Sequence, residues 1–393
     1  MKKSENSMKR PTNRRAFLTN GMVAAGAATI GASLLPGTST AFSGDGDSAP
    51  ITKGDIAILT FLSALEQVEA DLWIQYAELG GATNQGLSPI DLPFTGGLAP
   101  DYITGLLVLD GDMPQYISDN TDDEISHHRF LNNYLESKGA KQIDLSRFAI
   151  LPPSRVTGVP QKGRLTNLKQ LTIDTSWWTR YRSETANPDF GGTFENAVPD
   201  LAKGQHPAIP LSDGDLGVDA NGNISNHLQA IANTAGFHFA FIEQGGSSLY
   251  PALAQKVTNL EVLRILLSIG GVEIDHFSLW HDKMGNAVAP PVAPFSDPVT
   301  GLTFPDFNNP ANQNHNSQMF QTNLILPEPC EFLSPNLPPC SIIRPTLSAN
   351  GGPMATVQSF IADGLFIGQN PQFLEQLKEL ASEAEAARRE GQD

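Results

Sequence analysis

The chain has 393 residues, of which 40% are hydrophobic, which is enough for a large buried core and excludes a disordered protein. Its 42 acidic residues outnumber its 25 basic ones, and the formal charge of -17 argues against nucleic acid and anionic membranes as partners, because both would repel it. The 35 glycines and 29 prolines predict one folded core with many loops.

Residues 1–41 resemble a twin-arginine export signal. The Arg14-Arg15 pair is followed by a weakly apolar stretch at 21–35, and Ser39-Thr40-Ala41 has the small-residue pattern of a cleavage site. The apolar stretch is shorter than the roughly 20 residues that span a bilayer. We therefore expect export by the twin-arginine route to the periplasm or beyond the cell, with no stable membrane insertion after cleavage.

Four segments show apolar residues at helical spacing, and each predicts a long helix. The short connection between the last two makes them antiparallel neighbours, and Thr258 with Glu261 forms a predicted capping box at the start of the fourth. Residues 82–111, between the first two, are predicted to be a Gly/Pro-rich loop. The four helices are expected at 55–79, 114–139, 226–256 and 259–284.

The remaining segments are irregular. Residues 140–224 predict an elaborated surface insertion, and the proline-rich region that follows the fourth helix predicts either extended coil on the core or a mobile tail. Cys330 and Cys340 are expected to close a disulfide loop in an oxidising compartment. The expected parts are a helical domain at 53–286, an extension at 287–393, and two short helices near 356–366 and 371–389.

Two histidines follow a glutamate by three positions, in Glu124/His127 and Glu273/His276. Residues three apart share one face of a helix, and in the fourth helix that face is otherwise apolar, so a carboxylate and an imidazole point inward. A buried carboxylate is costly unless it is compensated. The pattern therefore requires either a cation or a dense hydrogen-bond network.

The other two helices carry acids within apolar stretches. These are Glu66 and Glu69 in FLSALEQVEADLW and Glu243 in FHFAFIEQGG. With one acid from each of these helices, the four helices supply four carboxylates and two imidazoles. That set matches the charge and the ligand preferences of two divalent cations.

The motifs LSALEQVEADLW, EISHHRFL, FIEQGG and EIDHF resemble the ferritin-like domain of rubrerythrin relatives and of exported desiccation- and stress-related proteins. The resemblance implies an all-α four-helix bundle, here with a long insertion between helices 2 and 3 and a Pro-rich C-terminal extension. It also implies two iron ions, with manganese or another divalent metal as the alternative. In helix 1 the resemblance favours Glu66 as the ligand, because the family often has an aromatic residue seven positions after the ligand and Trp73 stands there, but Tyr76 gives Glu69 the same spacing. The remaining implied ligands are Glu124, His127, Glu243, Glu273 and His276.

Several residues also have structural interpretations. Glu124 would cap a helix if that helix began at Thr121, and Asp123 could hold the ring of His127. The segment Asp219 to Asn223 lacks the terminal Glu of a calcium loop and predicts an ordinary turn. Further histidines and aromatics are expected to be satisfied core or surface residues, although an aromatic near a dimetal site could carry an electron: His128, His238, His281, Tyr134, Tyr250 and Trp280.

Two functions from different classes fit the sequence. The first is an exported dimetal oxidoreductase of stress protection that oxidises Fe(II) or reacts with oxygen or peroxide, with the metal ligands as its only catalytic groups. The second is a non-catalytic stress or envelope protein whose Glu/His cluster is empty or holds a structural ion. Gly-rich phosphate loops, nucleophile elbows and zinc-protease motifs are missing from the sequence, which argues against nucleotide binding and hydrolysis.

Overall fold

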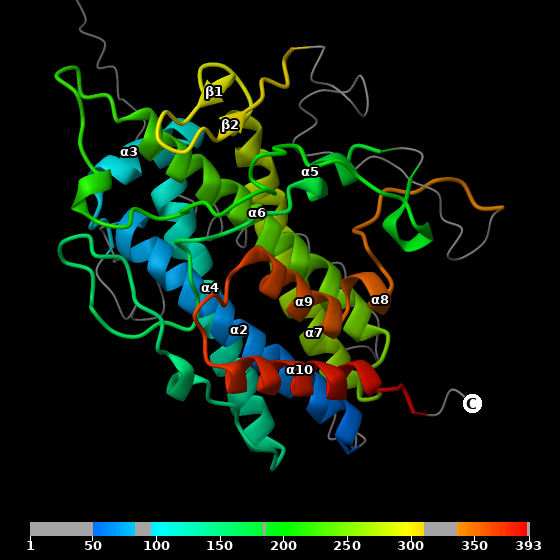
Figure 1. Cartoon of the computed structure of the whole chain (residues 1–393). Coiled ribbons are helices and arrows are strands. Elements are labelled where there is room, and N and C mark those ends of the chain that lie inside the picture. The colour runs from blue at the N-terminus through cyan, green and yellow to red at the C-terminus, as the bar shows by residue number, and fades with distance from the viewer. Residues whose placement is uncertain (1–49, 83–95, 184–185, 310–335, 391–393) are drawn as a thin grey trace, which may run out of the picture. The chain divides into compact units, whose positions relative to one another are not determined.

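Four long helices run side by side in the computed structural model and form the predicted all-α bundle (Figure 1). The structure describes residues 50–82, 96–183, 186–309 and 336–390, so the export signal and Cys330 lie outside the described residues. Each helix begins and ends within three residues of its prediction. The bundle helices are α2 (Lys53–Gly80), α4 (Met113–Ser137), α6 (Asn226–Ala254) and α7 (Leu260–Ala287).

Shorter elements surround the bundle. The two short strands pair antiparallel, with Phe295 opposite Phe304. The strands are β1 (Phe295–Ser296) and β2 (Thr303–Phe304), and the shorter helices are α3 (Pro100–Leu109), α5 (Ser176–Arg180), α8 (Ser348–Gly351), α9 (Pro353–Asp363) and α10 (Pro371–Ala386), with single 3-10 turns at Ser146–Phe148, Pro188–Phe190 and Asp213–Asp215.

Hydrogen bonds between helices fix the direction of each one. The amide of Ala82, just beyond α2, donates to the carbonyl of Pro114 near the start of α4, so α2 and α4 are antiparallel. α6 is antiparallel to α2, because Tyr76 near the end of α2 pairs with His238 in the first half of α6. α4 and α6 are therefore parallel, and the chain between them must cross the full length of the bundle.

The crossover explains why residues 140–224 are long. The predicted insertion lies over the bundle and buries apolar side chains such as Leu168, Leu171 and Trp177. The guanidinium of Arg164 also forms an ion pair with Glu78 of α2, and both side chains are buried. Such a pair is costly to break on one side only, so it holds the crossover to the bundle.

The caps of α2 and α7 lie together. Thr52 and Asp55 form a capping box at the start of α2, and Asp55 Oδ1 also accepts the amide of Thr258, 2.8 Å away, just before α7. The predicted capping box of Thr258 and Glu261 was wrong. Asn259 caps α7 instead, since its side chain accepts the amide of Glu261, whose carboxylate binds Tyr134 and Lys138.

The predicted loop at 82–111 contains helix α3, which the sequence did not reveal. Pro100 stands at the first turn, where its missing N–H is not needed. Gly105 allows a close approach to α6, since a Cβ there would lie 3.0 Å from the Cβ of Ala232. The proline and the glycine thus mark a helix start and a helix contact.

The C-terminal extension packs on the core where the structure describes it. α10 lies against α2 and α9 (Figure 1). Phe360 of α9 and Phe373 and Leu377 of α10 are buried. Cys340 is exposed, and because Cys330 lies outside the described residues the disulfide stays a prediction. Across the described parts of the chain, no helix is both long and apolar enough to cross a membrane.

Candidate metal centre

Six of the seven predicted ligands meet in the interior of the bundle. α2 contributes Glu66, α6 contributes Glu243, and α4 and α7 each contribute one Glu-x-x-His pair. They form two overlapping groups, and within each group the potential ligand atoms lie within 4.8 Å of one another. The first group is Glu66, Glu124, His127 and Glu273, and the second is Glu124, Glu243, Glu273 and His276.

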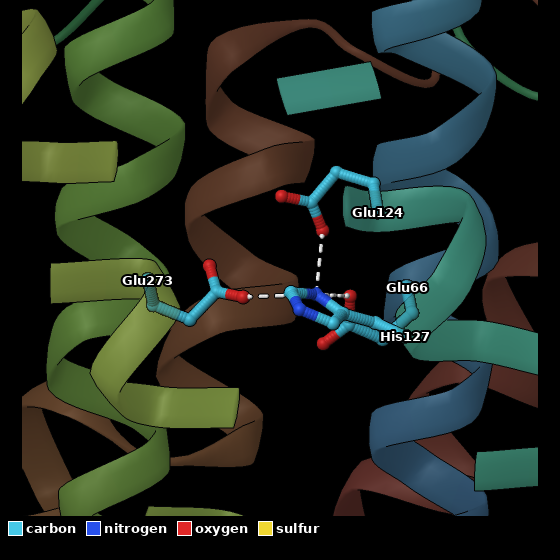
Figure 2. Close-up of side chains that lie close together, drawn as sticks. All are labelled: Glu66, Glu124, His127 and Glu273. Atoms are coloured by element: carbon cyan, nitrogen blue, oxygen red, sulfur yellow. Dashed lines mark hydrogen bonds and ion pairs between the residues drawn. The ribbon is translucent and has the colours of Figure 1, made fainter. Parts of the chain in front are cut away.

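The first group surrounds one imidazole nitrogen with three carboxylates from three helices. Nδ1 of His127 lies 3.2 Å from Glu124 Oε2, 3.3 Å from Glu66 Oε2 and 3.4 Å from Glu273 Oε1 (Figure 2). Glu124 and His127 project together from α4, while Glu273 reaches in from α7 on the opposite side (Figure 2). All four side chains are buried.

The second group repeats this arrangement around His276. Its Nδ1 lies 3.1 Å from Glu124 Oε1 and 3.4 Å from Glu243 Oε2. Glu124 thus presents one oxygen to each imidazole, and Glu273 belongs to both groups. The arrangement has two shared carboxylates, with Glu66 and Glu243 each confined to one group.

Several buried polar atoms in this cluster make no well-aligned hydrogen bond among the described residues, beyond the ion-pair contacts with the two imidazoles. They include both carboxylate oxygens of Glu273, one oxygen each of Glu66 and Glu243, and Nδ1 of His276. Unsatisfied buried carboxylates are rare because they cost the full desolvation of the group. Their lone pairs face a shared interior space, so hard or borderline divalent cations fit these residues.

The cluster carboxylates also hold protons on the two imidazoles. Burial lowers the pKa of His276, but the charge of Glu243 and the hydrogen bonds to Asp123, Glu124 and Glu243 together outweigh burial, and the pKa is raised well above its ordinary value. The pKa of His127 is raised in the same way, chiefly by Glu124. Burial raises the pKa of Glu273 well above its usual range. Metal ions entering the cluster would displace these protons, so binding must release protons to solvent.

Glu69 lies outside both groups, although it is buried beside them. Burial raises its pKa well above the ordinary value, and the charges of Glu273 and Glu66 raise it further. Burial also raises the pKa of Glu66, but the charge of His127 and the hydrogen bonds to His127, Glu124 and Tyr250 together outweigh this effect, and the pKa is lowered. Between the two helix 1 candidates, the structure therefore places Glu66 in the cluster as a carboxylate.

Asn120 and Tyr250 form hydrogen bonds with carboxylates of the cluster. Sequence reasoning missed Asn120 and assigned Tyr250 to the core. Tyr250 donates a hydrogen bond to Glu66 Oε1. The side-chain amide of Asn120 donates to both Glu124 Oε1 and Glu243 Oε1, each at 3.0 Å. Asn120 precedes Glu124 by four residues on α4, and this helical spacing was the signal that could have identified it.

Two alternative roles for α4 residues were wrong. The helix begins at Met113, so Thr121 and Glu124 lie in its interior and Glu124 caps nothing. Asp123 does hold an imidazole, but it is Nε2 of His276 on α7, 3.1 Å away, and not the ring of His127. Asp123 lies across from α7 because α4 and α7 are antiparallel, which the sequence alone could not show.

The other polar candidates take part in structural contacts. The carboxylate of Asp219 accepts the amides of Asn221 and Asn223 in its own turn, as predicted for an ordinary turn. His281 is buried against Arg182, and His128 is half-buried. These contacts do not indicate a metal site at the Asp219 turn or at the two histidines.

The comparisons agree with this geometry. The family model described as a ferritin-like domain matches residues 54–286, which cover the four bundle helices except for the first residue of α2 and the last of α7, and include the whole cluster. No curated protein and no solved structure matches the chain.

Proposed function

The chain belongs to the ferritin-like domain family, and from this premise we propose that its Glu/His cluster holds two iron ions and serves an exported oxidoreductase. The observation that carries the proposal is the sharing of Glu124 and Glu273 between two groups that each have one histidine. Four carboxylates balance two divalent ions, and carboxylate with imidazole suits iron or manganese.

The protein residues would have distinct roles. One ion would be held by Glu66, Glu124, His127 and Glu273, and the other by Glu124, Glu243, Glu273 and His276. Iron bound there would supply electrons to dioxygen or peroxide. Asn120 and Tyr250 orient the carboxylates through the hydrogen bonds described above, and Asp123 fixes the ring of His276.

Burial of the cluster supports a small co-substrate. Each of the six ligands is at least nine-tenths buried, and the two imidazoles, with 7% exposure each, retain the most contact with solvent. Dioxygen, peroxide and Fe(II) are small enough to approach at such an edge, whereas an organic substrate would require the helices to separate. We therefore propose Fe(II) oxidation or peroxide removal in stress protection as the activity.

Elemental mass spectrometry tests the site on mature chain purified without chelator. We expect about two iron or manganese ions per chain. Glu273→Ala should lower this content to half or less, and Glu379→Ala, an exposed change on α10, should leave it unchanged. A folded wild-type chain that cannot be loaded would support the non-catalytic alternative, with the cluster as a polar network.

Catalysis and export need separate measurements. Loaded chain should consume oxygen or peroxide with Fe(II) faster than free iron in the same buffer, and an equal rate would contradict the oxidoreductase. Export is tested by replacing Arg14-Arg15 with Lys-Lys, which should leave the uncleaved precursor inside the cell, and by sequencing the mature N-terminus, expected after Ala41.

A further inference from the structure

A second buried polar chain lies away from the candidate metal centre. The hydroxyl of Tyr76 lies 2.8 Å from Nδ1 of His238, and Nε2 of the same ring lies 3.1 Å from Asp363 Oδ2. Tyr76 and His238 are fully buried, and Asp363 is 2% exposed. Three ionisable groups therefore form one hydrogen-bonded chain inside the protein, where such networks are strong and specific.

The order of donors follows from the geometry. A hydrogen on Nε2 of His238 faces the Asp363 carboxylate, so Nδ1 carries a lone pair and accepts the hydroxyl hydrogen of Tyr76. Burial raises the pKa of Tyr76 well above its usual range, so the phenol stays neutral at rest. Tyr76 can thus lose its proton only to His238.

Aromatic rings connect Tyr76 with the cluster. The ring of Trp73 lies 5.8 Å from that of Tyr76 and stacks on Trp280 at 5.4 Å, and Phe239 packs against all three. The indole nitrogen of Trp280 donates to Asn120 Oδ1 at 2.8 Å. Asn120 in turn donates to two cluster carboxylates, so a continuous path of rings and hydrogen bonds joins Tyr76 to the centre.

We propose that Tyr76 is a redox-active tyrosine, which loses one electron along Trp73 and Trp280 toward the centre and its phenolic proton to Nδ1 of His238. A phenol that loses an electron becomes strongly acidic, so a base already in hydrogen-bond contact lowers the barrier. The product is a neutral tyrosyl radical beside an imidazolium that Asp363 stabilises.

The oxidant is hydrogen peroxide reduced at the candidate centre, and in this respect the inference rests on the proposed function. Reduction of one peroxide to two waters takes two electrons and two protons. Tyr76 supplies one electron, Fe(II) supplies the other, and solvent supplies the two protons, since the phenolic proton stays on His238.

The position of Asp363 gives the C-terminal extension a role. Asp363 ends α9, beyond the region at 54–286 that matches the ferritin-like family, and its carbonyl accepts the amide of Thr172 from the crossover. The bundle provides the tyrosine and the histidine, while the extension provides the acid.

Tyr102 serves as a control for Tyr76. It is equally buried, but its hydroxyl donates to the backbone carbonyl of Ala208, which cannot accept a proton.

Photo-oxidation of the full chain without added metal tests the inference independently of the metal centre. A ruthenium polypyridyl complex with an electron scavenger is the oxidant, and electron paramagnetic resonance detects the radical. The background carries Tyr116→Phe and Tyr134→Phe, which removes the two half-buried tyrosines. We expect a persistent neutral tyrosyl signal that Tyr76→Phe abolishes and Tyr102→Phe leaves intact.

His238→Gln tests the proton acceptor, because glutamine can accept the hydrogen bond but is not basic. Its tyrosyl signal should be lost although circular dichroism shows the wild-type fold, and Asp363→Asn should shorten the lifetime of the radical. A signal that survives Tyr76→Phe, an undiminished signal in folded His238→Gln, or no signal in the wild-type background would each overturn the inference. A chain that binds no metal would contradict the proposed function and leave this result unaffected.

Discussion

The Asp123 carboxylate lies 3.1 Å from Nε2 of His276, while Nδ1 of the same ring faces Glu124 and Glu243. A carboxylate behind an imidazole fixes its orientation and increases its basicity as a ligand. α4 thus supplies the candidate ligand Glu124. The preceding residue of α4, Asp123, orients the candidate ligand His276 on α7.

Asp123→Asn should therefore weaken metal binding without removing a ligand. We expect an affinity loss of about 10- to 100-fold, as for other groups that orient a metal-bound histidine. Competition with a chelator of known affinity measures it. Asp275→Asn, an exposed change next to His276, is the control, and equal affinities in the two variants would contradict the role of Asp123.

Gly246 lies against Glu273, a candidate ligand that belongs to both groups of the cluster. A Cβ at 246 would lie 2.5 Å from Glu273 Oε2, whereas one at Gly245 would meet no atom within 4 Å. Gly246→Ala should displace the carboxylate and lower metal content. Gly245→Ala should keep the metal and stabilise α6 by up to about 1 kcal/mol, since alanine favours helix. Elemental analysis and thermal unfolding of both variants measure these effects, and full metal content in Gly246→Ala would show that Glu273 does not bind.

Glu69 and Glu66 should respond oppositely to amide substitution. The pKa of Glu69 is raised in the folded chain, because burial disfavours the charged carboxylate. The stability that Glu69 contributes is therefore fully present below about pH 4.5, and it is lost as the pH rises toward the folded pKa. Glu69→Gln should therefore raise the melting temperature of metal-free chain at pH 7 and keep its metal binding. Glu66→Gln should lower metal content, and a similar loss in Glu69→Gln would identify Glu69 as a ligand.

His281 should make the fold sensitive to acid. Its Nε2 lies 2.7 Å from the Arg182 guanidinium, and burial, with a further contribution from Arg182, lowers its pKa well below the ordinary value. The unfolded chain gains this proton below about pH 6.5 while the folded chain does not, so stability falls as pH falls.

Replacement of His281 by Gln should remove this component of the pH dependence. Between pH 6.5 and pH 5 we expect about 2 kcal/mol of lost stability in the wild type that the variant does not show, at 1.36 kcal/mol per pH unit. Urea unfolding across this range measures both chains relative to their stabilities at pH 8. Parallel curves would mean that His281 takes up its proton in the folded state as readily as in the unfolded one.

Local sequence patterns determined the four bundle helices and the candidate ligands. Apolar residues at helical spacing require a buried face, and the Glu-x-x-His spacing places both side chains on that face. These features depend only on residues within a few turns of one another. For the same reason the sequence misread α3, because Pro100 and Gly105 are typical of loops unless the packing partner of the helix is known.

Contacts between distant segments decided the rest. The choice of Glu66 over Glu69 depends on which side of α2 faces His127, and the pairing of Asp123 with His276 depends on the antiparallel register of α4 and α7. The hydrogen-bonded chain of Tyr76, His238 and Asp363 joins residues from the bundle and the extension. The sequence by itself determined which residues face inward, because helical periodicity is local, whereas only the tertiary structure decided which of them meet, because that depends on helix direction, register and the path of the crossover.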